Sequence, residues 1–122
     1  MIKIETKNAP GAIGPYSQGY IANGLVFTSG QIPVDPVSGE IPCGISAQAA
    51  QSCKNVGAIL EAAGSDLTKV IKTTCFLANM EDFAAFNEVY ATYFTEKPAR
   101  SCVAVKQLPK NVLCEIEAIA EL

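Results

Sequence analysis

Two ionisable residues near the C-terminal end of the chain stand out by their position. Arg100 follows Pro-Ala at the start of a predicted strand, and Glu115 lies inside the last predicted strand. A guanidinium can bind a carboxylate through two parallel hydrogen bonds, and a partly buried glutamate can act as a general base. The sequence alone does not show that the two side chains meet. Without further information, Arg100 would be interpreted as a solvated surface arginine and Glu115 as a strand residue that faces solvent.

The absence of histidine narrows the possible chemistry. The chain contains no His, which excludes Ser-His and Cys-His nucleophile pairs and every zinc site that includes His. Any reaction must therefore use Arg, Glu, Asp, Lys, Tyr, Ser, Cys or backbone groups. The cysteines are odd in number and form no CxxC motif, so we expect reduced thiols at Cys43, Cys53, Cys75, Cys102 and Cys114.

Turn residues and apolar periodicity predict the elements that must position these side chains. A first helix is predicted to begin after Ser46 as its N-cap and to end before Gly64. A second helix is predicted to begin at Asn79 and to end before Pro98, with a buried aromatic face. Strands are predicted at residues 2–6, 20–22, 25–29, 70–77, 101–106 and 113–121, with a hairpin turn at 23–24 and a structured loop over 8–19.

The last predicted strand alternates in the two-residue period of a sheet. We expect one face to pack on the helices and the other to border solvent or another subunit. The first face carries Cys114, Ile116, Ala118 and Ala120, and the second carries Leu113, Glu115, Glu117, Ile119 and Glu121.

The order of the elements predicts an α+β sandwich in one domain, residues 1–122, with both helices on one face of a mixed sheet. The other face of the sheet then needs cover. Nothing else in the chain can supply it, so we expect self-association.

Composition excludes several classes of function. The net charge is −3 and no run of Lys and Arg is present, so the electrostatic footprint of a nucleic-acid-binding protein is missing. No apolar stretch approaches the length of a membrane span, and the N-terminal residues lack the apolar core of a signal peptide. We therefore expect a cytoplasmic protein.

Several sequence blocks resemble the RidA (YjgF) family of reactive-intermediate deaminases. They are NAPGAIGPYSQG at residues 8–19, FTSGQIPVDPVSGE at 27–40, AAGSDLTKVIKTTCFLANMEDFAAFNEVY at 62–90 and PARSCVAVKQLPKNVLCEIEAIA at 98–120. They cover nearly the whole chain in the order that the family has them. One departure is the short connection at residues 95–97, where some relatives carry several more residues.

The resemblance implies a chorismate-mutase-like fold, a homotrimer with a cleft between each pair of subunits, and no metal or organic cofactor. It also implies hydrolysis of enamines and imines such as 2-aminoacrylate, which pyridoxal-phosphate enzymes release, to 2-keto acids and ammonia. Arg100 resembles the family's binder of the substrate carboxylate. Glu115 resembles the residue that positions and deprotonates the attacking water.

Five further residues resemble the family's substrate-binding positions. Tyr16 resembles a tyrosine that lines the cleft, and Ser29 and Gly30 resemble a small pair whose hydroxyl and backbone groups reach the substrate. Asn87 resembles another cleft residue. Cys102 occupies a position where family members carry a thiol, and without a His to lower its pKa we interpret it as a wall residue and not a nucleophile.

Three other functions are compatible with parts of this pattern. A non-catalytic protein that binds keto acids would use Arg100 and would not need Glu115. A ribonuclease or translation-inhibitor role has been attached to relatives, but the negative charge and the absence of His oppose it. A thiol-based role would rest on the five cysteines, whose scatter through predicted strands and helix faces indicates buried small residues.

Overall fold

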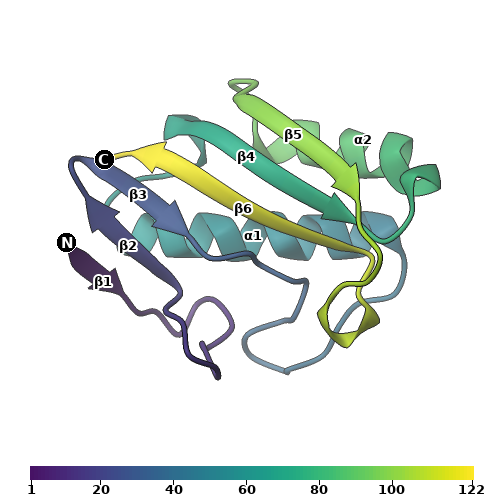
Figure 1. Ribbon diagram of the computed structural model, residues 1–122, viewed down its shortest axis with the longest axis horizontal. Coiled ribbons are helices and arrows are strands. Elements are labelled where there is room, and N and C mark those ends of the chain that lie inside the picture. The colour runs from purple at the N-terminus through teal and green to yellow at the C-terminus, as the bar shows by residue number, and fades with distance from the viewer.

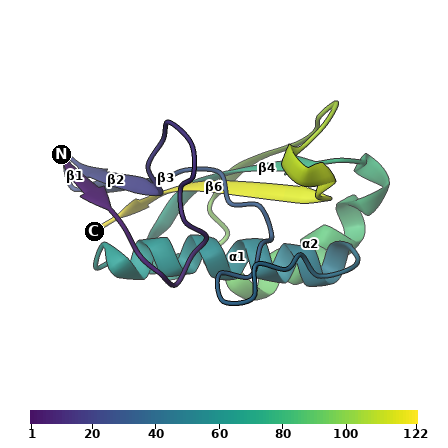
Figure 2. The ribbon, with the colours of Figure 1, turned by 90° about the horizontal axis from the view of Figure 1, so that it is seen from below.

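A six-stranded mixed sheet with two helices against one face makes up the fold (Figures 1 and 2). The computed structural model describes all residues, 1–122. The strand order is β1-β2-β3-β6-β4-β5, and only β4 and β5 run parallel. This is the predicted α+β class. The elements are β1 (Ile2–Ile4), β2 (Gly19–Ala22), β3 (Leu25–Thr28), α1 (Ile45–Ala62), β4 (Val70–Leu77), α2 (Phe83–Tyr93), β5 (Ala99–Ala104) and β6 (Cys114–Glu121).

The hairpin between β2 and β3 turns where the sequence predicts. Asn23 and Gly24 both have positive φ angles, 53° and 75°. This is the backbone that a two-residue type I′ turn requires, and Asn-Gly adopts it at low cost. The hairpin aligns β3 with β6 at the centre of the sheet.

The predicted start of α1 is wrong by two residues. The helix begins at Ile45 with Gly44 as its N-cap, and Ser46 lies inside the first turn. Gly44 has a φ of 87°, a conformation that favours glycine, so the chain enters the helix without a capping side chain. The other end is as predicted. Gly64 has a φ of 89°, and the Ser65 N–H donates to the Leu60 carbonyl at 2.9 Å, as in a Schellman motif.

The second helix begins through a short 3₁₀ turn. The Asn79 side chain accepts from the Glu81 N–H at 2.9 Å and caps the 3₁₀ segment Met80–Asp82, which leads directly into α2. The helix ends before Pro98, as predicted. Phe86 and Tyr90 form its buried face, and Phe94 at its C-terminal end continues that face.

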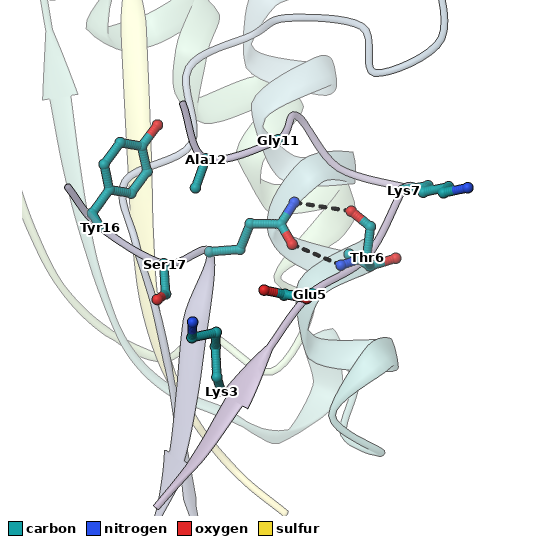
Figure 3. Close-up of a pocket in the computed structure, with 9 residues that line it drawn as sticks. Lys3, Glu5, Thr6, Lys7, Gly11, Ala12, Tyr16 and Ser17 are labelled. Atoms are coloured by element: carbon teal, nitrogen blue, oxygen red, sulfur yellow. Dashed lines mark hydrogen bonds between the residues drawn. The ribbon is translucent and has the colours of Figure 1, made fainter. Parts of the chain in front are cut away.

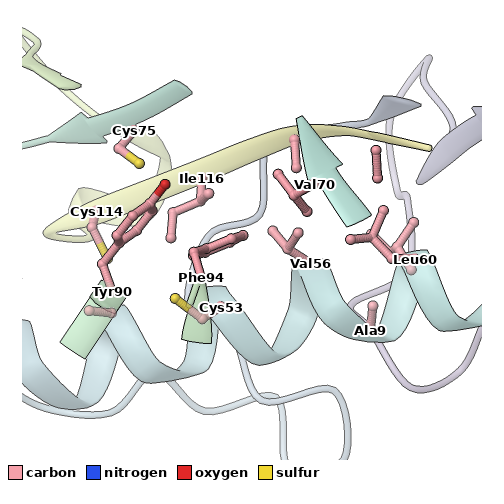
Figure 4. Packing of buried hydrophobic residues seen from close by; sticks show 14 of the residues in the cluster. Ala9, Cys53, Val56, Leu60, Val70, Cys75, Tyr90, Phe94, Cys114 and Ile116 are labelled. Atoms are coloured by element: carbon pink, nitrogen blue, oxygen red, sulfur yellow. The ribbon is translucent and has the colours of Figure 1, made fainter. Parts of the chain in front are cut away.

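The hydrophobic core lies between the sheet and the helices (Figure 4). The predicted inner face of β6 is confirmed, because its four inner residues are at most 2% exposed. Three of the cysteines belong to this core as free thiols: Cys53, Cys75 and Cys114. Burial is the main cause that raises the pKa of Cys114 to about 11 and that of Cys75 to about 12, so these thiols stay neutral and act as packing residues.

Neither α1 nor α2 covers the opposite face of the sheet (Figure 2). Large apolar side chains remain exposed there, including Phe27 on β3 at 40% and Val103 on β5 at 46%. One chain therefore leaves this face uncovered, and the partner that covers it stays a prediction. No helix of the structure has both the length and the apolar run needed to cross a bilayer.

Candidate active site

The sheet places Arg100 and Glu115 on opposite faces. Arg100 pairs with Thr73 in the parallel β4–β5 register, and Thr73 is fully buried and hydrogen-bonded to Tyr90 of α2. Arg100 therefore points to the helix side of the sheet. Glu115 lies between Cys114 and Ile116, whose side chains pack into the core, so it points to the uncovered side. Within one chain the two side chains cannot reach the same small molecule.

The predicted site residues accordingly fall into two groups. We call Arg100, Asn87 and Cys102 the arginine half-site. We call Tyr16, Ser29, Gly30 and Glu115 the glutamate half-site.

In the arginine half-site, α2 fixes the guanidinium of Arg100. Arg100 Nη1 donates to Asn87 Oδ1 at 2.7 Å. The guanidinium carbon lies 4.8 Å from the Tyr90 ring centroid and 5.5 Å from that of Phe83. No carboxylate is among the hydrogen-bond partners of Arg100. The remaining N–H groups of the fork are therefore available to an anion.

A cavity of about 320 Å³ lies beside this guanidinium. Arg100, Asn87, Tyr90 and Lys97 are among its eight lining residues, and none of the eight is acidic. Lys97 belongs to the short connection at 95–97, so that connection contributes a second cation to the cavity. The lining favours a negatively charged ligand.

Cys102 lies two residues beyond Arg100 on the same side of β5, next to Cys75. Burial raises the pKa of its thiol, and the charge of Arg100 opposes that shift only in part. A neutral thiol is a poor nucleophile. The structure therefore supports the interpretation of Cys102 as a wall residue.

In the glutamate half-site, the Glu115 carboxylate lies directly against the backbone of Gly30. A Cβ atom at Gly30 would overlap the Glu115 carboxylate, so only glycine lets this side chain lie against the backbone. Backbone hydrogen bonds hold the same segment to β6. The Gln31 N–H donates to the Ile116 carbonyl at 2.7 Å, and the Ile116 N–H donates back at 3.2 Å.

Ser29 connects this segment to the loop that carries Tyr16. The Ser29 hydroxyl donates to the Ser17 carbonyl, and the Ser29 N–H donates to the Gln18 carbonyl at 2.8 Å. The hydroxyl proton is thus engaged within the chain, and only the oxygen lone pairs remain for a ligand. Tyr16 is 54% exposed and lines a cavity of about 520 Å³ together with Gly30 and Gln31.

Sequence reasoning missed Gln18, which shapes the loop around Tyr16. Its buried side-chain amide accepts from the Thr6 N–H at 2.7 Å and donates to the carbonyls of Thr6 and Pro10 at 3.0 and 2.8 Å. Figure 3 shows the two bonds to Thr6 beside a second cavity, of about 610 Å³, that Tyr16 and Ser17 also line. A glutamine just before a strand carries no sequence signal for such a role.

Comparison with known proteins decides the family. The family model described as endoribonuclease L-PSP matches residues 6–122. The chain belongs to this family, that of the RidA (YjgF) proteins. The resemblance that the sequence blocks indicate is confirmed.

Individual relatives match over nearly their whole length. The 2-iminobutanoate/2-iminopropanoate deaminase of Escherichia coli is 54% identical over 121 residues, which cover 96% of this chain and 94% of the relative. AldR of Lactococcus lactis, a candidate regulator by its name, is 57% identical with 98% and 96% covered. The crystal structure of Escherichia coli TdcF with bound serine superposes with a TM-score of 0.97 at 52% identity, covering 100% of this chain and 99% of TdcF.

In this RidA-family chain the Glu115 carboxyl lies in an environment that disfavours its charge. Burial is the main cause that raises its pKa, and the negative charge of Glu117, two residues along the same strand face, raises it further. Glu117 itself is exposed. No group of three or more acidic or thiol side chains is arranged to hold a metal ion. Independence of metal stays a prediction.

We predict that Glu115 titrates above the ordinary glutamate range and that Glu117→Gln lowers its pKa only in part, because burial is the larger cause. The carboxylate of Glu115 is then lost as the pH falls through this raised pKa, and any turnover that needs a base falls with it. Carbon-detected NMR of the side-chain carboxyls measures both midpoints. A Glu115 midpoint at or below the ordinary value, or one unmoved by Glu117→Gln, would contradict this description.

Proposed function

We propose that this protein hydrolyses 2-imino acids, formed from enamines such as 2-aminoacrylate, to 2-keto acids and ammonia. The observation that carries the proposal is the Arg100 guanidinium, which α2 holds beside a cavity without acidic residues and which lacks a carboxylate partner. The proposal is supported by 54% identity, over nearly the full length of both chains, to a relative named as a 2-iminobutanoate/2-iminopropanoate deaminase. Serine bound to TdcF is consistent with a ligand that carries a carboxylate.

The active site is proposed to form between chains. Arg100 lies on β5, at one edge of the sheet, and Glu115 lies on the uncovered face. A second copy that sets its Arg100 edge against this face brings an arginine half-site to a glutamate half-site and covers the exposed apolar side chains. We propose the homotrimer of the RidA family, with three such clefts, as the assembly that does this.

The reaction then needs binding, one aimed water and one proton shuttle. The substrate carboxylate binds the free edge of the Arg100 fork through two hydrogen bonds. Glu115 takes a proton from water as the water oxygen adds to the imine carbon, and the proton passes to the nitrogen. Glu115 then takes the hydroxyl proton of the carbinolamine and passes it to the amine nitrogen, so that the C–N bond breaks, ammonia leaves and the carbonyl of the keto acid forms. Because such imines hydrolyse readily in water, lowering the barrier by a few kcal/mol (about 1.4 kcal/mol per tenfold in rate) is sufficient.

Two alternatives use the same chain differently. A protein that only binds keto acids needs Arg100 but no base at Glu115, so the two residues separate these functions. The family's description suggests a ribonuclease role, but this chain has no histidine, no run of basic residues and a net charge of −3, all of which oppose that role.

The proposed function needs no metal or organic cofactor. The cytoplasmic location of the protein stays a prediction.

Arg100→Lys and Glu115→Gln are expected to separate binding from chemistry. Lysine keeps the charge but loses the planar fork, so keto-acid binding should weaken by about 1.5–3 kcal/mol, the range of a charge-assisted hydrogen bond. Glu115→Gln keeps the shape but removes the base, so binding survives while turnover falls. General-base catalysis contributes roughly 100- to 10,000-fold, which is an upper guide for so facile a reaction.

Imine decay in an assay coupled to an enzyme that releases 2-aminoacrylate, together with calorimetric titration of a keto acid, measures both effects. Unchanged turnover in Glu115→Gln with the assembly intact would remove Glu115 from the mechanism. If no form of the protein outpaces spontaneous decay, yet all except Arg100→Lys bind keto acid, the protein is a binding module.

The proposed assembly has a mass of about 38 kDa, three times the 12.8 kDa of the chain. Light scattering at micromolar concentration should give this value, because the uncovered sheet face and both half-sites need a neighbour. A stable monomer of about 13 kDa would contradict the composite site.

A further inference from the structure

We infer that Tyr90 is a positioning residue for carboxylate recognition, because its ring holds the Arg100 guanidinium in the orientation that presents its free edge to the ligand. The inference rests on the proposed function. Tyr90 acts through Arg100 and not on the reacting atoms.

The guanidinium of Arg100 packs against one face of α2. Phe83, Asn87 and Tyr90 are spaced by four and three residues, so they lie on one face of the helix. All three contact Arg100: the two rings at 5.5 and 4.8 Å from the guanidinium carbon, and Asn87 through its hydrogen bond. The nearer ring is that of Tyr90, within the range of a cation–π contact.

Tyr90 is itself immobilised by Thr73, Phe94 and Phe86, whose ring centroid lies 5.8 Å from that of Tyr90. Its hydroxyl lies 2.7 Å from Thr73 Oγ1 on β4, and its ring stacks on Phe94 with the centroids 4.5 Å apart. The side chain is 8% exposed. Burial is the main cause that raises the pKa of its phenol, so the ring stays neutral and the hydrogen bond to Thr73 persists. A ring fixed in this way is a rigid platform for a planar cation.

This arrangement limits the orientations open to Arg100. The Tyr90 ring packs against the flat guanidinium, Asn87 takes one N–H, and the other N–H groups remain for a bidentate carboxylate. Arg100 and Tyr90 both line the cavity without acidic residues where that carboxylate would bind. Without the ring, the long Arg100 side chain regains rotamer freedom that binding must then remove.

The test compares three variants in the full-length protein by imine turnover and by keto-acid titration. Tyr90→Leu removes the ring and should raise KM and the keto-acid Kd by roughly 3- to 30-fold, the range that cation–π contacts span, with kcat changed far less. Tyr90→Phe keeps the ring and should restore KM to within about threefold of the parent value. Tyr93→Leu is the matched control, because Tyr93 is an aromatic residue of the same helix whose ring neither packs on the Tyr90 ring nor lies against Arg100. It should leave KM unchanged.

A double-mutant cycle separates positioning from general packing. Tyr90→Leu placed on Arg100→Lys should raise KM no further, because the group that it positions is already lost. If Tyr90→Leu fails to fold, Phe83→Leu removes the more distant ring and should give a smaller rise that the Arg100→Lys background also abolishes.

The outcomes distinguish the two levels of proposal. If Arg100→Lys leaves KM and Kd unchanged, Arg100 does not bind the carboxylate and the proposed function fails. If Arg100→Lys weakens binding but Tyr90→Leu has no larger effect on KM than the control Tyr93→Leu, only the positioning role of Tyr90 is overturned. Additive effects of Tyr90→Leu and Arg100→Lys would overturn it as well.

Discussion

The alternation of side chains along β-strands is the constraint on which this account depends. It sends Arg100 to the helix side of the sheet and Glu115 to the uncovered side, although β5 and β6 both pair with β4. No rotamer change can bring the two side chains to one small substrate within a chain. A site that uses both residues must therefore be assembled from two chains, and the exposed apolar residues of the uncovered face provide a surface on which a second copy can pack.

Each half of the proposed site is fixed by packing within its own chain. On the helix side, one stripe of α2 surrounds the guanidinium with two rings and an amide, and Thr73 holds the nearer ring. On the uncovered side, the absence of a side chain at Gly30 lets the Glu115 carboxylate lie against the backbone, while Gln18 shapes the loop that carries Tyr16. In the proposed assembly, association would then only have to align two preformed surfaces, which lowers the ordering cost of binding.

Local patterns predicted most of the fold. The 70–77 strand, the Asn-Gly hairpin and the inner face of the last strand follow from turn chemistry and two-residue periodicity, and the structure has them. The start of α1 was mispredicted because a serine near a helix start is the usual cap signal, whereas here Gly44 enters the helix through a positive φ.

The arrangement of the site could not be predicted in the same way. Whether Arg100 and Glu115 share a face depends on which strands pair and in what register, and such long-range pairings leave no trace in local sequence. The same holds for Gln18, whose partners lie 8 to 12 residues away in the chain, and for the contact of Tyr90 with Arg100. The family resemblance supplied the identities of the candidate residues, and the structure shows how the sheet divides them.

Mixed assemblies of two inactive variants test the composite site most directly. Arg100→Lys and Glu115→Gln chains are unfolded, combined in equal amounts and refolded, and imine hydrolysis is measured at low substrate concentration. If each cleft takes Arg100 from one chain and Glu115 from its neighbour, about a quarter of the clefts in a random mixture regain both residues, and activity rises above that of either variant alone. If both residues acted within one chain, no cleft could regain the pair. Activity no higher than the average of the two variants, in a mixture shown to contain hybrid assemblies, would contradict the account.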